Sequence, residues 1–110
     1  VANNSGVIEQ LGAAAGRIAA TGAIDNRAGR IAGIGAGALA VTAGTTLDNT
    51  AGGLVGANGA LTLGAARMAN TGGAVEAGDT LTVAAAQLEN PDGRIRARGA
   101  AGITATGALD

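Results

Sequence analysis

The sequence predicts an all-β fold, a parallel β-helix of about five coils of 20–23 residues each. A segment of the form aliphatic-x-Asn-x-x-Gly-x-aliphatic recurs five times, with its asparagines 23, 23, 21 and 20 residues apart. Between these segments, apolar residues alternate with Ala or Thr, which is the pattern of a strand with one buried face. A repeat of about 20 residues is too short for a pair of helices and matches one turn of a β-helix.

Composition agrees with a repeated, turn-rich fold. The 110 residues include 21 glycines and no Phe, Tyr or Trp. A core without aromatic side chains must be thin, and glycine spread along the whole chain disfavours helices. A leucine-rich repeat of similar length would need the pattern L-x-x-L-x-L before each Asn, and no copy has it. The composition therefore favours many similar turns around a narrow core.

Stacking in register would place equivalent residues of successive coils about 4.8 Å apart. We therefore predict three buried columns of aliphatic side chains. The first holds Val1, Ile24, Leu47, Met68, Leu88 and Leu109; the second holds Ile8, Ile31, Leu54, Val75 and Ile95; the third holds Ile18, Leu39, Leu61, Leu81 and Ile103. Coils then start near Val1, Ile24, Leu47, Met68 and Leu88, and residues 1–110 form one repeat segment, a fragment of a longer fibre.

The repeated asparagines form a column of their own, made of Asn3, Asn26, Asn49, Asn70 and Asn90. Asparagine tolerates left-handed backbone at a bend, and stacked amides can hydrogen-bond along the axis of the coil. The glycine three residues after each Asn would supply a positive φ or close packing. We therefore predict a structural ladder with no role in binding a ligand.

The residues that usually carry catalysis are almost absent. The chain has no His, Cys, Tyr or Lys and a single serine, Ser5. We expect no catalytic site, no metal and no cofactor, so the chain is predicted not to be an enzyme. Its net charge of −1 gives no basic patch for nucleic acid. The alternative of a carbohydrate-active β-helix enzyme would depend on one carboxylate column, Asp25, Asp48 and Glu89, which we interpret as solvated turn charges.

Two exposed rows of side chains suggest further alternatives. Arg94, Arg96 and Arg98 alternate with apolar residues, so they would project together and could bind a sulfated glycan. Thr62, Thr82 and Thr104 would form one outward rank, as in some ice-binding proteins. In both cases we prefer an ordinary solvent-exposed strand face. The uncharged stretch 31–47 is shorter than the roughly 20 residues of a membrane helix, and it keeps the repeat register.

The units Leu47–Leu54 (LDNTAGGL) and Ala60–Gly73 (ALTLGAARMANTGG) resemble the shaft repeats of the filamentous haemagglutinin family. These are large adhesins that Gram-negative bacteria export by two-partner secretion. The resemblance covers essentially the whole chain and is strongest from Ile24 to Leu109. It implies a right-handed β-helix, in line with the general rule for parallel crossovers.

The resemblance also implies a function, that of a structural shaft segment of a secreted adhesin on the bacterial cell surface. Such a segment would act as a rigid spacer in host-cell attachment and virulence. Its implied partners are neighbouring repeats of the same chain and an outer-membrane transporter during secretion. The parent protein as a whole would also bind host-cell receptors or sulfated glycans.

Overall fold

The computed structural model describes residues 2–12, 14–35 and 37–107, and within these ranges it contains twelve β-strands and no helix. The strands are β1 (Val7–Gln10), β2 (Gly16–Ala20), β3 (Ile24–Asp25), β4 (Arg30–Gly33), β5 (Leu39–Ala43), β6 (Thr46–Asp48), β7 (Leu54–Ala57), β8 (Leu61–Ala69), β9 (Ala74–Ala77), β10 (Leu81–Glu89), β11 (Arg94–Ala97) and β12 (Ala101–Ala105). The described residues include no helix long and apolar enough to cross a membrane, and the stretch 31–47 contributes to β4, β5 and β6.

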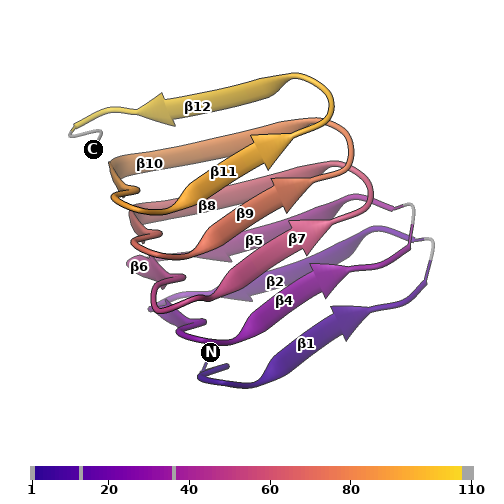
Figure 1. Ribbon diagram of the computed structural model, residues 1–110, viewed down its shortest axis with the longest axis horizontal. Coiled ribbons are helices and arrows are strands. Elements are labelled where there is room, and N and C mark those ends of the chain that lie inside the picture. The colour runs from indigo at the N-terminus through magenta and orange to yellow at the C-terminus, as the bar shows by residue number, and fades with distance from the viewer. Residues whose placement is uncertain (1, 13, 36, 108–110) are drawn as a thin grey trace.

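The strands form two parallel sheets that face each other across the core (Figure 1). One sheet has the order β1-β4-β7-β9-β11, and the other has the order β12-β10-β8-β5-β2, with β3 and β6 beside it. As the chain climbs from β1 to β12, the front strands of Figure 1 run left to right and the strands behind them return. The protein is therefore a right-handed parallel β-solenoid of about five turns, which confirms the predicted fold class.

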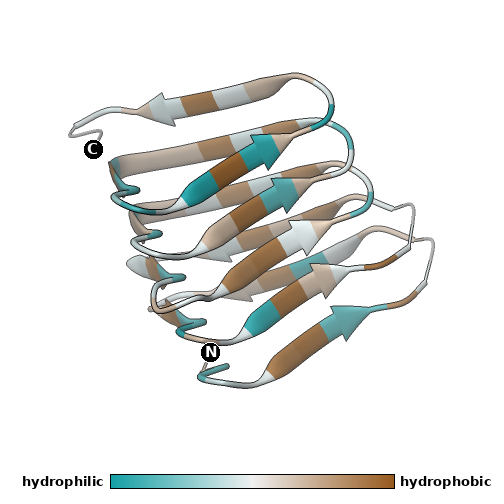
Figure 2. Cartoon of the chain, viewed as in Figure 1, coloured by the Kyte–Doolittle hydropathy of each residue, from teal (hydrophilic) through white to brown (hydrophobic). Residues whose placement is uncertain are grey.

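The first predicted column of aliphatic side chains is confirmed for the described residues. It holds Ile24, Leu47, Met68 and Leu88, which pair in register and are at most 1% exposed. Its two outer members, Val1 and Leu109, lie outside the described residues. The hydrophobic segments of successive strands lie one above another (Figure 2). Each coil therefore completes the buried face of its neighbours.

The second predicted column contains one error. Ile31 pairs with Val55, and Val55 pairs with Val75, whereas Leu54 pairs with Arg30 and Ala74 and is only half-buried. The third asparagine turn is one residue longer than the others, so counting five residues from Asn49 reaches Leu54, one position too early. Leu54 therefore lies on the outer face of the sheet, and Val55, which is 0% exposed, belongs to the core.

The third predicted column is in fact two columns. Leu39, Leu61 and Leu81 pair in register, but their partners in the end coils are Gly16 and Ala101. The prediction placed Ile18 and Ile103 with these leucines, and this was wrong. Both isoleucines belong to a fourth column, which runs Ile18, Val41, Leu63, Val83 and Ile103. The core therefore has four aliphatic columns.

The strand register also corrects the predicted rank of threonines. Thr62 pairs with Thr82, but the next partner along is Gly102, whereas Thr104 pairs with Ala84. The outward rank therefore contains only two threonines. A flat ice-binding surface needs threonines at the same position in successive coils. The register of the described strands shows no such row of three, so the sequence pattern that suggested ice binding does not hold.

Candidate functional site

The repeated asparagines lie at the turn that leads into each strand of the five-stranded sheet. The side chains form a chain of hydrogen bonds in which Nδ2 of one asparagine donates to Oδ1 of the asparagine in the next coil. The four successive pairs are Asn3 to Asn26 (2.8 Å), Asn26 to Asn49 (2.8 Å), Asn49 to Asn70 (2.8 Å) and Asn70 to Asn90 (2.7 Å). The same nitrogens donate their second hydrogen to backbone oxygens of the next coil, those of Arg30, Leu54, Ala74 and Arg94.

This arrangement uses the hydrogen-bonding groups of the inner asparagines within the protein. Asn26, Asn49 and Asn70 are 0% exposed, and each accepts from one neighbouring coil and donates twice to the other. A buried amide with all its partners supplied adds to stability, whereas an unpaired one is costly. The inner amides have no group left for a ligand, so the geometry favours a structural role.

The turn conformation shows which of the two predicted roles, a positive φ or close packing, each glycine three residues after an Asn fulfils. Positive φ values occur two residues after each Asn, at Ser5, Ala28, Ala51, Gly72 and Asp92, and at the additional residue Gly52. Gly29 and Gly73, three residues after Asn26 and Asn70, are needed for close packing, as predicted. A Cβ on Gly73 would lie 1.9 Å from the backbone oxygen of Asn49. The four non-glycine residues in left-handed backbone could not be placed from the sequence alone, because Ser and Ala carry no signal for it and Asp has only a statistical preference.

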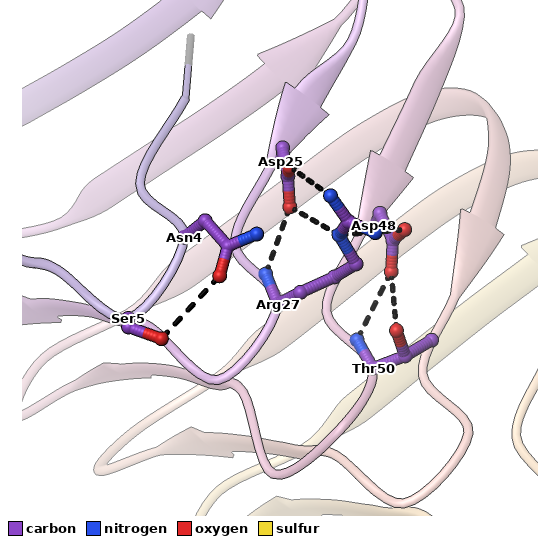
Figure 3. Close-up of polar contacts among 6 residues, drawn as sticks. All are labelled: Asn4, Ser5, Asp25, Arg27, Asp48 and Thr50. Carbon is purple, nitrogen blue, oxygen red and sulfur yellow. Dashed lines mark hydrogen bonds and ion pairs between the residues drawn. The ribbon is translucent and has the colours of Figure 1, made fainter.

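The predicted carboxylate column is in register. Asp25 pairs with Asp48, Asp48 with Ala69, and Ala69 with Glu89. Asp25 accepts three hydrogen bonds from Arg27, namely from its backbone nitrogen and Nε at 3.0 Å each and from Nη2 at 2.9 Å (Figure 3). Asp48 accepts from the backbone nitrogen and the hydroxyl of Thr50.

These contacts oppose the alternative of a glycosidase. Hydrogen bonds from Arg27 hold the pKa of Asp25 below its usual range, and Asp25 in turn raises the pKa of Arg27. A glycosidase needs one carboxylic acid with a raised pKa that can give a proton to the leaving group. Glu89 is paired too, because Arg67 Nε donates to its Oε1 at 2.6 Å. The hydrogen bonds of Asp25 and Asp48 therefore stabilise their own turns, and that of Glu89 joins two neighbouring coils.

The Asp25–Arg27 pair makes a testable prediction about acid stability. Because the pKa of folded Asp25 is lowered, its contribution to stability is complete above the unfolded pKa of about 3.9 and disappears as the pH falls through the lower folded value. Replacing Arg27→Gln should lower the thermal midpoint slightly at neutral pH and not at strongly acidic pH. Thermal unfolding followed by circular dichroism across this range measures the difference, and Arg17→Gln is the control. A difference between wild type and Arg27→Gln that stays constant with pH would contradict the prediction.

The predicted arginine row lies on β11 and the residue that follows it. Arg94, Arg96 and Arg98 are all exposed, and Arg96 Nε lies 3.9 Å from Glu76 Oε2 on β9. Arg30 occupies the same column as Arg94 but is separated from it by Leu54 and Ala74. Arg96 and Arg98 line a shallow surface groove of about 470 Å³ with Glu76 and Asn58. The row is therefore a small basic patch that one carboxylate partly neutralises.

The stacked coils, the four aliphatic columns and the amide ladder define a structural repeat protein of the β-solenoid class. Comparison with known families agrees: the haemagglutinin repeat matches residues 1–28 and 34–110. The chain belongs to the haemagglutinin repeat family, which confirms the resemblance of its repeats to filamentous haemagglutinin. No curated protein and no solved structure matches it.

Proposed function

We propose that the chain is a shaft segment of a secreted bacterial surface adhesin and acts as a rigid spacer in attachment to host cells. The observation that carries the proposal is the continuous register from β1 to β11 and from β2 to β12. The neighbouring partners are repeats of the same chain, and export by two-partner secretion would require an outer-membrane transporter.

Stiffness follows from the way the coils are joined. Every strand pairing is parallel and links one coil to the next, and the asparagine ladder adds buried hydrogen bonds along the same axis. In a solenoid of this kind each repeat contacts only its neighbours, so added coils extend the rod without changing its width. These are the properties that a spacer needs.

The spacer proposal predicts how the molecule grows. Arrays of one, two and three copies of residues 1–108 should lengthen by about 4.8 Å per coil, or ~24 Å per copy, at constant cross-section. Small-angle X-ray scattering measures both quantities. In an adhesin that carries this segment, replacing it with the same number of unrelated β-solenoid coils should preserve attachment. Loss of attachment after this replacement would show that the segment binds a partner, and a cross-section that widens with copy number would refute the rod.

A second candidate function is binding of an anionic glycan. Three arginines exposed at strand spacing, two of which line one groove, favour it, because guanidinium groups bind sulfate and carboxylate in a bidentate manner. Glu76 opposes it, since it places a negative charge beside Arg96.

Retention on a heparin column distinguishes the two candidates. If the patch binds glycans, Arg96→Ala/Arg98→Ala should lose retention at low salt, whereas Arg17→Ala/Arg67→Ala, which removes the same charge elsewhere, should keep it. Both pairs are exposed, so the comparison separates a specific patch from overall charge. Equal retention of the two double variants, or none for the wild type, would leave only the structural function.

A further inference from the structure

Asparagine can react with the backbone that follows it, and the fold treats the seven asparagines of this chain differently. In this reaction the nitrogen of the next residue loses its proton and attacks the side-chain Cγ. The bond from Cγ to Nδ2 breaks, ammonia leaves and a five-membered succinimide forms. Water then opens the ring at either carbonyl and gives aspartate or isoaspartate. The reaction needs a free nitrogen, little bulk on the next residue and an accessible amide.

Six asparagines lack at least one of these requirements. Asn3, Asn26, Asn49 and Asn70 are buried, with their amides in the ladder. Asn90 precedes Pro91, which has no N–H. Asn4 is exposed, but the next nitrogen, that of Ser5, donates to the backbone oxygen of Arg27 at 3.0 Å. The strand pairing and the ladder therefore protect these positions.

Asn58 meets all three requirements. It is exposed in the bend that follows β7, and the next residue is Gly59, which has no side chain to obstruct the attack. Among the described residues, the nitrogen of Gly59 has no hydrogen-bond acceptor. One contact holds the side chain, since Asn58 Nδ2 donates to the backbone oxygen of Ile34 in the preceding coil at 2.5 Å.

We infer that Asn58-Gly59 is a self-modification site, at which the folded chain converts Asn58 to aspartate and isoaspartate without an enzyme. The product cannot donate to Ile34, so one contact between the second and third coils is lost. The new carboxylate adds a negative charge to the groove that Arg96 and Arg98 line. Isoaspartate also lengthens the main chain by one carbon shortly before β8. This inference does not depend on the shaft proposal.

The experiment follows the folded chain at mildly alkaline pH, where more of the backbone nitrogen loses its proton. Peptide mass spectrometry locates the amide that becomes an acid, and an isoaspartate methyltransferase assay identifies the isoaspartate. Conversion should occur at Asn58, while the other six asparagines keep their amides. Gly59→Ala should slow it on the order of tenfold, because a methyl group crowds the attacking nitrogen.

Two controls make the inference falsifiable. Asn58→Gln should abolish isoaspartate formation, since glutamine would have to close a larger ring, and Asn4→Gln should leave the rate unchanged. Circular dichroism confirms that each variant is folded. Conversion of Asn4 as fast as that of Asn58 would overturn the inference. So would an Asn58 that reacts in urea and keeps its amide in the folded chain, because the fold would then protect it.

Discussion

Leu81→Asp is expected to unfold several coils together, with a loss of at least about 4 kcal/mol of stability. Leu81 on β10 is 1% exposed and pairs with Leu61 on one side and Ala101 on the other. The substitution removes a buried aliphatic side chain and buries a carboxylate. No cation could pair with it, because all seven arginines are exposed.

Thr82→Asp is the matched control, one residue along the same strand. Thr82 is exposed on the outer face, so the new charge stays in water and should cost less than about 1 kcal/mol. Limited proteolysis and thermal unfolding of both variants, in the chain and in a longer array, measure the difference. Because each coil completes the core of the next, cleavage in Leu81→Asp should extend into neighbouring coils. Equal disruption by the two variants would mean that the register of β10 is wrong.

Asn49→Asp is expected to cost about 3 kcal/mol or more at neutral pH. Asn49 is 0% exposed, and its Nδ2 donates to Asn70 Oδ1 at 2.8 Å and to the backbone oxygen of Ala74 at 2.9 Å. In the variant, a carboxylate oxygen would replace Nδ2 and face the two oxygens that now accept from it, those of Asn70 and Ala74. The carboxylate would also be a buried charge. The side chains differ by one atom type, so the change tests the hydrogen bonds with almost no change in volume.

The pH dependence gives a second measurement of the same substitution. An aspartate in this position should have a raised pKa, because burial and the facing oxygens disfavour its charged form. The variant should therefore recover stability as the pH falls below that value, since the protonated acid can donate once. The pH dependence is opposite to that of Asp25, whose contribution to stability is lost as the pH falls. Asn4→Asp, at an exposed position, is the control, and equal melting of the two variants at neutral pH would show that the ladder does not stabilise the coil.

Most of the fold could be predicted because the chain repeats. The offset from Asn to the preceding aliphatic residue is the same in every copy, so the column Ile24, Leu47, Met68 and Leu88 follows from the spacing alone. The carboxylates one residue before the asparagines fall into register for the same reason. Their hydrogen bonds to Arg27 and Thr50, however, required the turn geometry.

The errors arise where copies differ in length or where two apolar residues are adjacent. Leu54 and Val55 are both aliphatic, so hydrophobicity could not decide which one faces the core. The longer turn, with Gly52 at a positive φ, moves the strand by one residue and places Val55 inside. Ile18 and Ile103 were misplaced similarly, because the leucine position is occupied by Gly16 and Ala101 in the end coils.

The sequence by itself determined the period, the parallel β-solenoid and the identity of the stacked asparagines, because a short repeat with alternating strands has few ways to bury its apolar face. The tertiary structure alone decided the fourth aliphatic column, the left-handed residues of the turns and the direction of the amide ladder. It also decided which asparagine is left exposed beside a backbone nitrogen that has no acceptor among the described residues. These features depend on hydrogen bonds between coils, which join residues about 20 positions apart and leave no local signal in the chain.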